Sequence, residues 1–279
     1  MKKPSLLRTI LIRVARICVL TLLGVTLYVR IFEKRLVYYP SKELVGHPRL
    51  PYEDVFFRAS DGVRLHGWFM PRQHTGAVVI VSHGNAGNIS DRYEMGEYLT
   101  QELDVNVLMY DYRGYGMSEG EPSEEGTYSD IRGAYAYIRS RGYPPSMVFV
   151  FGQSLGTAIA IDLAAQETVG GIILEAPFTS VRALARHLTF GLPIDYLLTI
   201  RYDSLSKTDG IRAPVAVIHS RRDPVIPFAL GMDLYQQLPG PKRFFEVQGE
   251  IHEGALLALG IERTRELKEF VFPKQQTAP

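Results

Sequence analysis

The sequence of 279 residues has only one cysteine, Cys18, so it can form no disulfide bond within the chain and carries no C-x-x-C metal motif. Its net charge of +1 and its lack of a basic stripe give no reason to expect a nucleic acid as partner. It contains neither an H-E-x-x-H motif nor a carboxylate-rich loop, so we expect no metal and no cofactor. Internal repeats and low-complexity linkers are also missing. The composition is that of an ordinary globular protein, and 279 residues are enough for one large domain and a short appendage.

The longest apolar run lies near the N-terminus. Residues 17–29 are free of charge, but these 13 residues are fewer than the roughly 20 that a membrane-spanning helix needs. Arginine side chains near the ends can reach the lipid headgroups, which extends the span to about 20 residues from Arg13 onward. We therefore expect a single-pass transmembrane helix in an N-terminal membrane anchor, residues 1–35, followed by a catalytic domain, residues 36–279. The lipid bilayer would then be a partner of the protein.

Two other interpretations of this run remain open. Lys2, Lys3 and Arg8 precede it as in a cleaved secretory signal, although no A-x-A-like cleavage site follows. A buried core helix is the other alternative.

The orientation in the membrane follows from the basic residues on either side of the run. Five basic residues precede the charge-free run and four follow it, which favours a cytoplasmic N-terminus and a catalytic domain outside the cytoplasm.

The rest of the chain alternates short β-rich runs with helical patterns. Asp61 and Gly62 form a turn signal between two runs of a hairpin, 55–58 and 63–70. Further apolar runs predict strands at 77–82, 105–110, 147–151, 171–174, 215–218 and 243–247, and helical patterns occupy 90–102, 124–141, 155–167, 228–238 and 254–270. This alternation predicts an α/β fold with an eight-stranded, mostly parallel sheet, helices on both faces and an antiparallel edge.

One long connection interrupts the alternation. About 37 residues, 177–213, separate two predicted strands, whereas an ordinary loop between a helix and a strand has roughly 2–6. This segment is rich in leucine, isoleucine and aromatic side chains. We expect it to form a small lid insertion over the active site. An extra helical layer without substrate contact is the alternative.

A nucleophile is predicted by the pentapeptide at 152–156, which reads G-Q-S-L-G. It directly follows a predicted strand and precedes an apolar helical run, 158–165. In this context a G-x-S-x-G motif holds its serine on a strained strand-to-helix turn, where the flanking glycines leave room for the backbone. The helix N-terminus behind the serine favours developing negative charge. We therefore predict that Ser154 is the catalytic nucleophile.

A serine nucleophile needs a base that takes its proton. His252 suits this role because it lies in a loop between the last predicted strand and the last predicted helix. His219, at a strand end, is the rival base, while His187 lies in the predicted lid and His83 opens a glycine-rich loop.

The base in turn needs a carboxylate that fixes its tautomer and stabilises its charged form. Asp223 lies in a loop just after the strand 215–218, and the chain order serine, acid, histidine is the one known for this kind of nucleophile turn. Glu175 is the alternative acid. In a purely structural role, Asp223 would form a surface salt bridge with Arg221 or Arg222.

The tetrahedral intermediate of acyl transfer also needs hydrogen-bond donors for its oxyanion. We expect the backbone N–H of Leu155, directly after the nucleophile, and the backbone N–H of Asn85, in the glycine-rich loop 83–88, with Ala86 as second choice. We expect a further loop, 111–116, to brace its neighbours through ion pairs and hydrogen bonds of Asp111 and Arg113. It is not a phosphate-binding loop, because it lacks the third glycine and the helix of that motif.

Five segments together form a recognisable set of motifs: HGNAGN at 83, DYRGYGMSEGEPSEEG at 111, GQSLG at 152, DPVIP at 223 and IHEG at 251. This set resembles the α/β-hydrolase superfamily over roughly residues 31–271. More narrowly, it is similar to the membrane-anchored serine-hydrolase branch, which includes protein depalmitoylases and many uncharacterised bacterial members. Ser220 departs from the family pattern, which usually has a glycine after the histidine.

The resemblance implies the α/β-hydrolase fold, a Ser154–Asp223–His252 triad, and Asn85 and Leu155 as oxyanion donors. It is much less specific for the substrate. From the apolar lid and the anchor we expect hydrolysis of an ester or thioester in an acyl-lipid or acylated substrate near a membrane. An aminopeptidase-like serine peptidase, which would need acidic lid residues for a substrate ammonium, and a non-catalytic binding protein are the alternatives.

Overall fold

The computed structural model describes residues 6–73, 75–191 and 193–272. Its central sheet has eight strands in the order β10-β9-β8-β7-β4-β6-β3-β2. The strands are β2 (Glu53–Arg58), β3 (Arg64–Met70), β4 (Val78–Ser82), β6 (Asn106–Tyr110), β7 (Val148–Gln153), β8 (Gly171–Glu175), β9 (Val215–Ser220) and β10 (Lys242–Val247). The hairpin strands β2 and β3 pair antiparallel, and β3 also pairs antiparallel with β6, whereas every other neighbouring pair in this sheet is parallel. The predicted mostly parallel sheet with an antiparallel edge is confirmed.

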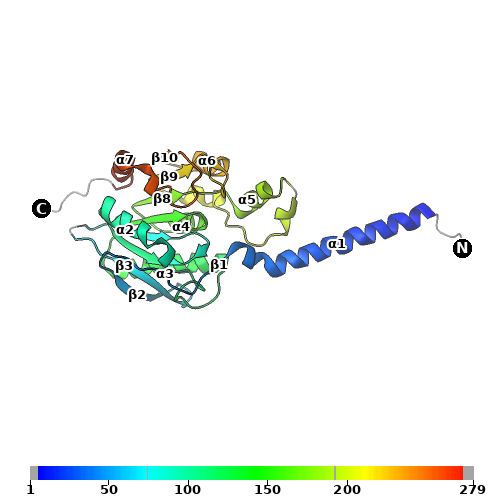
Figure 1. Cartoon of the computed structure of the whole chain (residues 1–279), viewed down its shortest axis with the longest axis horizontal. Coiled ribbons are helices and arrows are strands. Elements are labelled where there is room, and N and C mark those ends of the chain that lie inside the picture. Colours follow the sequence, from blue (N-terminus) through cyan, green and yellow to red (C-terminus); the bar gives the residue numbers. More distant parts are fainter. Residues whose placement is uncertain (1–5, 74, 192, 273–279) are drawn as a thin grey trace.

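Helices cover both faces of this sheet (Figure 1). On one face lie α3 (Glu124–Ser140), α4 (Leu155–Gln166) and α6 (Phe228–Gln237), and on the other lie α2 (Tyr93–Glu102) and α7 (Ile261–Val271). Alternate residues of β4 point into the two layers: Val78 and Ile80 into the first, Val79 and Val81 into the second. Burial on both faces explains why the central strands read as continuous apolar runs.

The last helix is shorter than its pattern predicts. We expected a helix over 254–270, but α7 begins only at Ile261, after a loop and the short 3-10 helix η5 (Leu257–Leu259). Gly254 and Gly260 both have positive φ angles, which interrupt a helix. The backbone N–H groups of Gly254 and Leu256 instead donate to the carboxylate of Glu175. The residues after His252 therefore form a loop that is held to the sheet.

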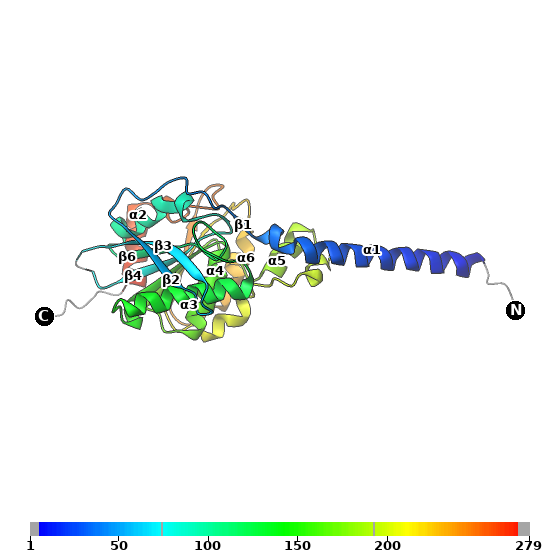
Figure 2. The ribbon, with the colours of Figure 1, turned by 90° about the horizontal axis from the view of Figure 1, so that it is seen from below.

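The N-terminal helix α1 (Leu6–Val37) extends away from the domain as a rod, as Figures 1 and 2 show. Its 32 residues correspond to about 48 Å of helix. Leu7–Val37 is long and apolar enough to cross a membrane, and its most apolar window is not buried against the domain, which argues against a core helix. A signal sequence would meet the same criteria. The last turns of α1 contact the rest of the protein, and there Glu33 is buried.

The lid insertion, residues 177–213, contains α5 (Val181–Leu188) and the 3-10 helices η3 (Pro193–Leu197) and η4 (Leu205–Gly210). Ser180 caps α5, because its hydroxyl accepts a hydrogen bond from the N–H of Ala183. In both ribbon views α5 lies beside the domain end of α1 (Figures 1 and 2). Directly after α1, the short strand β1 (Tyr39–Pro40) pairs in parallel with β5 (Ala86–Gly87), which belongs to the loop after β4. Helix α1, the segment 177–213 and this loop thus meet at one end of the domain.

Candidate active site

Ser154 lies on a sharp turn between β7 and α4. Its φ angle is +50°, a strained value for a residue with a side chain. The two flanking glycines are required by packing: a Cβ on Gly152 would come within 2.5 Å of the carbonyl oxygen of Gly156, and a Cβ on Gly156 within 2.0 Å of the carbonyl oxygen of Ser82. This explains the G-x-S-x-G pattern, since any larger residue would push α4 away from β4 and β7.

The three residues predicted to form the triad lie together at one edge of the sheet, in the loops that follow β7, β9 and β10. His252 Nε2 lies 3.1 Å from Ser154 Oγ, and His252 Nδ1 lies 2.9 Å from Asp223 Oδ2. A carboxylate only accepts hydrogen bonds, so Nδ1 carries the proton and Nε2 is left to accept one from the serine hydroxyl. This geometry would allow the serine hydroxyl to pass its proton to a histidine that the carboxylate orients.

Asp223 is held in its charged form by several donors. Burial alone would raise the pKa of this carboxyl, but hydrogen bonds from His219 and His252 and from the backbone N–H of Val225 lower it well below its usual value. The N–H groups of Val225 and Ile226 both donate to Oδ1 at 2.8 Å. These bonds keep the acid ionised and fix its orientation towards the histidine.

The structural role considered for Asp223 is wrong. Its side chain is buried, while Arg221 and Arg222 pair instead with Glu246 and Glu250 at the surface.

The rival residues have other tasks. His219 lies behind Asp223, with Nε2 3.3 Å from the carboxylate and 3.1 Å from the carbonyl oxygen of Ile226. Glu175, the alternative acid, accepts hydrogen bonds from Gln153 and from the backbone of the loop after His252. Its pKa is raised by burial, against the lowering effect of these hydrogen bonds. Glu175 therefore supports both the nucleophile turn and the base loop without reaching the histidine ring.

The two residues predicted as oxyanion donors, Asn85 and Leu155, line the same cavity as Ser154. Leu155 is the first residue of α4, so its N–H has no acceptor within the helix. The carbonyl oxygen of Asn85 accepts from the backbone of Tyr39 and the hydroxyl of Tyr115, and its side chain donates to the carbonyl oxygen of Val37. Among the described residues no hydrogen bond from the Asn85 N–H is found. This loop is therefore fixed while its N–H stays available to a ligand.

Arg92 is a residue of the site that sequence reasoning missed. Its side chain is buried and bonds to three segments. Nε donates to Gln153 at the end of β7 (2.9 Å), Nη1 to the carbonyl oxygen of Ala86 (2.8 Å), and Nη2 to Glu253 next to His252 (2.8 Å). No local pattern distinguishes this arginine from those on the surface. Only the contact between distant loops reveals it.

Ser220, the departure from the family pattern, also joins two loops. Its hydroxyl donates to the carbonyl oxygen of Gly249 at 2.5 Å. The loop that carries Asp223 is thereby tied to the loop that carries His252. The loop 111–116 has the bracing role that we expected, because Arg113 pairs with Asp61 and Asp130.

A cavity of about 390 Å³ opens beside Ser154. Its lining is mostly apolar and comes from the end of α1, from the lid helix α5 and from Val225 and Ile226 after β9. Val181, Leu184 and Leu188 of α5 lie on one face of that helix and point into the cavity. The segment 177–213, which we expected to form a lid, therefore contributes one wall of the cavity beside Ser154.

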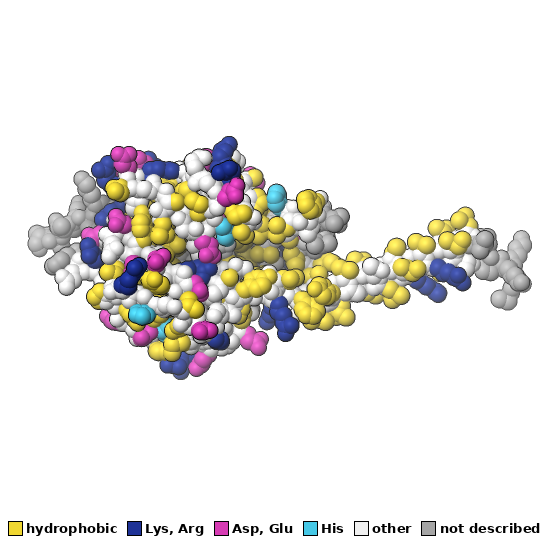
Figure 3. Space-filling view, viewed as in Figure 1, with side chains coloured by type: hydrophobic (Ala, Val, Ile, Leu, Met, Phe, Trp, Pro, Cys, Tyr) yellow, Lys and Arg dark blue, Asp and Glu magenta, His cyan; other side chains and the backbone are white. Residues whose placement is uncertain are grey.

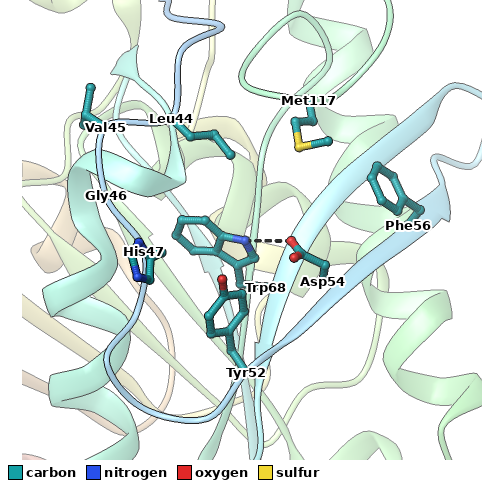
Figure 4. Close-up of a pocket in the computed structure, with 9 residues that line it drawn as sticks. All are labelled: Leu44, Val45, Gly46, His47, Tyr52, Asp54, Phe56, Trp68 and Met117. Atoms are coloured by element: carbon teal, nitrogen blue, oxygen red, sulfur yellow. Dashed lines mark hydrogen bonds between the residues drawn. The ribbon is translucent and has the colours of Figure 1, made fainter.

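A second cavity, of about 510 Å³, lies apart from these residues (Figure 4). Aromatic side chains of Tyr52, Phe56 and Trp68 line it, and the Trp68 indole donates to Asp54. None of the triad residues contributes to it.

Within the described ranges no group of three or more His, Cys, Asp or Glu side chains could hold a metal ion.

Comparison with known proteins supports this description of the fold. Residues 73–193 match a family model described as serine aminopeptidase, S33. The uncharacterized protein Rv2307c of Mycobacterium tuberculosis is 35% identical over 254 residues, which is 89% of this chain and 90% of that protein. The α/β hydrolase domain-containing protein WAV2 of Arabidopsis thaliana is 40% identical over 58% of this chain and 56% of its own length. Among solved structures, the esterase Pf2001 of Pyrococcus furiosus superposes with a TM-score of 0.67 at 19% identity, covering 83% of this chain and 97% of that one, a likeness of fold alone.

Proposed function

Because this chain belongs to the α/β-hydrolase superfamily, we propose that it is a serine hydrolase that cleaves an ester or thioester through an acyl-enzyme intermediate. The observation that carries this proposal is the continuous chain of contacts from Ser154 Oγ through the His252 ring to the Asp223 carboxylate. No cofactor is needed for this chemistry.

The reaction proceeds in two steps. In the first, Ser154 Oγ attacks the carbonyl carbon while His252 Nε2 takes the hydroxyl proton and passes it to the leaving alcohol or thiol. The backbone N–H groups of Asn85 and Leu155 stabilise the negative charge on the carbonyl oxygen. In the second step, a water molecule gives a proton to His252 and attacks the acyl carbon. The bond between this carbon and Ser154 Oγ then breaks, His252 returns the proton to Oγ, and the acid is released.

The substrate that fits this site best is an acyl-lipid or an acylated molecule at a membrane surface. The cavity beside Ser154 has a mostly apolar lining, which suits a hydrocarbon chain. The apolar helix α1 leads directly to this cavity, and we propose that it anchors the protein in the bilayer. An enzyme held in this way meets a membrane-bound substrate without having to extract it into water.

An aminopeptidase is the second candidate, because the matching family model carries that description. Such an enzyme needs a carboxylate in the cavity that binds the ammonium group of a peptide. Glu33 lines the cavity, but its carboxylate already accepts hydrogen bonds from the backbone N–H groups of Thr199 and Ile200 and from the Thr199 hydroxyl. In the lid, Asp195 is buried in an ion pair with Arg186. Asp195 does not line the cavity, and the Glu33 carboxylate is already bonded, so neither is placed to bind a substrate ammonium group.

Labelling of the full-length protein with a fluorophosphonate probe tests the proposal. We expect the wild type to be labelled at Ser154 and to hydrolyse p-nitrophenyl esters, and Ser154→Ala to do neither. In Asp223→Asn the histidine loses its orienting charge, so turnover should fall by roughly 10³–10⁴ with folding unchanged.

A protein that hydrolyses amino-acid p-nitroanilides faster than esters would be the peptidase. A correctly folded wild type that reacts with neither the probe nor any of these substrates would be a binding protein on a hydrolase fold.

A further inference from the structure

The helix that we propose as the membrane anchor forms part of the catalytic cavity. Val29, Glu33 and Leu36 of α1 line the space beside Ser154. Their spacing of four and three residues brings them onto one face of the helix. The anchor therefore supplies a wall of the site, and its last turns differ in role from the exposed turns that precede them.

The opposite wall is the apolar face of α5. Val181, Leu184 and Leu188 recur there at the same helical spacing and face the cavity. Between the two helices the cavity extends from Ser154 and Leu155 towards Leu188, which is 62% exposed on the lid surface. Figure 3 shows hydrophobic side chains along α1 and in the hollow between α1 and the lid. An apolar path thus connects the surface of the anchor to the nucleophile.

Glu33 holds the two walls at a fixed spacing. This side chain is only 3% exposed, and burying a carboxylate is costly unless donors satisfy it. Three donors from Thr199 and Ile200, in the lid insertion, do so. On the other side, the Asn85 side chain donates to the carbonyl oxygen of Val37 at 2.8 Å. The end of α1 is therefore bonded both to the lid and to the loop of the predicted oxyanion donor.

We propose that α1 and α5 together form the binding site for a long acyl chain, with Val29 and Leu184 as the residues that determine which chain length is accepted. This inference rests on the proposed ester or thioester hydrolysis at Ser154. The acyl carbon lies at Ser154 and the chain runs between the helices towards the membrane end of α1. The anchor is then a specificity element of the enzyme as well as a tether.

The proposal is tested with substitutions that narrow the cavity between α1 and α5, one on each helix. They are made in the full-length protein, which is assayed in detergent micelles. Val29→Trp and Leu184→Trp should each lower the ratio of kcat/KM for p-nitrophenyl palmitate to that for p-nitrophenyl butyrate by about tenfold or more, since a few lost methylene contacts have effects of this size. Val29→Ala, which widens the channel, should raise the ratio. Leu27→Trp is the matched control, because Leu27 lies on the same helix, is 61% exposed and does not line the cavity. Its ratio should equal that of the wild type.

A second arm compares a long-chain monoacylglycerol in vesicles with a palmitoyl-peptide thioester, which distinguishes a lipid from an acylated protein as source of the chain. Val29→Trp should weaken hydrolysis of whichever the wild type accepts. Unchanged ratios in all three channel variants, with wild-type melting temperatures, would overturn the acyl site alone. A wild type that hydrolyses no ester of any length would overturn the proposed function instead.

Discussion

At the scale of single residues, the site depends on side chains that act on other side chains. His219 and two backbone N–H groups keep Asp223 ionised, Glu175 holds the backbone next to His252, and Ser220 ties the acid loop to the base loop. Such supporting contacts matter because a misplacement of about 1 Å in a catalytic group can reduce the rate by roughly 100-fold.

Arg92 is the residue at which this support is most concentrated. In Arg92→Lys the charge remains, but one ammonium cannot replace three directed bonds to Gln153, Ala86 and Glu253. We expect kcat/KM for a short ester to fall by roughly 10- to 100-fold and the rate of fluorophosphonate labelling to fall in parallel. Glu253→Gln removes only the ion pair and should have a smaller effect. Full activity in Arg92→Lys would show that the loops hold their positions without it.

The buried His83 makes the stability of the fold depend on pH. Burial, with the nearby Arg92 charge, lowers the pKa of His83 to about 3, whereas in the unfolded chain it is about 6.5. Between pH 7 and pH 5 only the unfolded state gains a proton there, so the free energy of unfolding falls by about 2 kcal/mol from this residue. Unfolding by urea in micelles should show a smaller loss over this range in His83→Gln than in the wild type. Equal losses in both proteins would contradict the neutral, buried state of His83.

At the scale of elements, close packing of α4 on the sheet forms the nucleophile turn. All residues of α4 from Leu155 to Ala164 are buried, and its first turn lies against the end of β4. The end of helix α1 is held in a similar way, because its buried Glu33 accepts hydrogen bonds from the lid segment. In each case an element is placed by contacts at its end rather than by its own helix-forming tendency.

The glycine after the nucleophile tests the first of these contacts. In Gly156→Ala the added methyl group would overlap the carbonyl oxygen of Ser82, which is backbone and cannot rotate away. We expect a loss of roughly 1–3 kcal/mol in stability and no labelling of Ser154, measured by thermal melting and by the fluorophosphonate probe.

Gly76→Ala is the control for this change, since a Cβ there would meet only the mobile end of the Met147 side chain, at 3.3 Å. Its melting temperature and labelling should match those of the wild type. Labelling of Gly156→Ala at the wild-type rate would contradict the packing argument.

At the scale of the whole molecule, the catalytic domain and α1 form an asymmetric body with its site at the junction (Figure 1). Two exposed aromatic residues of the lid, Phe190 (98% exposed) and Tyr196, lie beside this junction. Aromatic side chains are favourable at a membrane interface, so their exposure is compatible with the membrane anchor that we propose. With α1 in the bilayer, as we propose, the site would face the lipid surface.

This arrangement predicts that the mature protein keeps its N-terminal helix. After alkaline carbonate extraction of cells, we expect the intact chain of 31.4 kDa in the membrane pellet, with N-terminal peptides detected by mass spectrometry. A shortened chain in the soluble fraction would instead identify residues of α1 as a cleaved signal.

Protease protection in sealed vesicles then tests the expectation that the catalytic domain lies outside the cytoplasm.

The local sequence determined the strands, most helices and the turn at Ser154. These features depend on the spacing of apolar residues and on the positions of glycines within a few neighbouring residues. The predicted triad followed from loop positions after strands, since parallel strands bring such loops to one edge. Only the tertiary structure decided that Arg92 bonds to three distant segments, that Glu33 bonds to Thr199 and that α1 lines the cavity. These contacts join residues far apart in the chain, and their energy comes from burial and hydrogen bonds that exist only once the elements have packed.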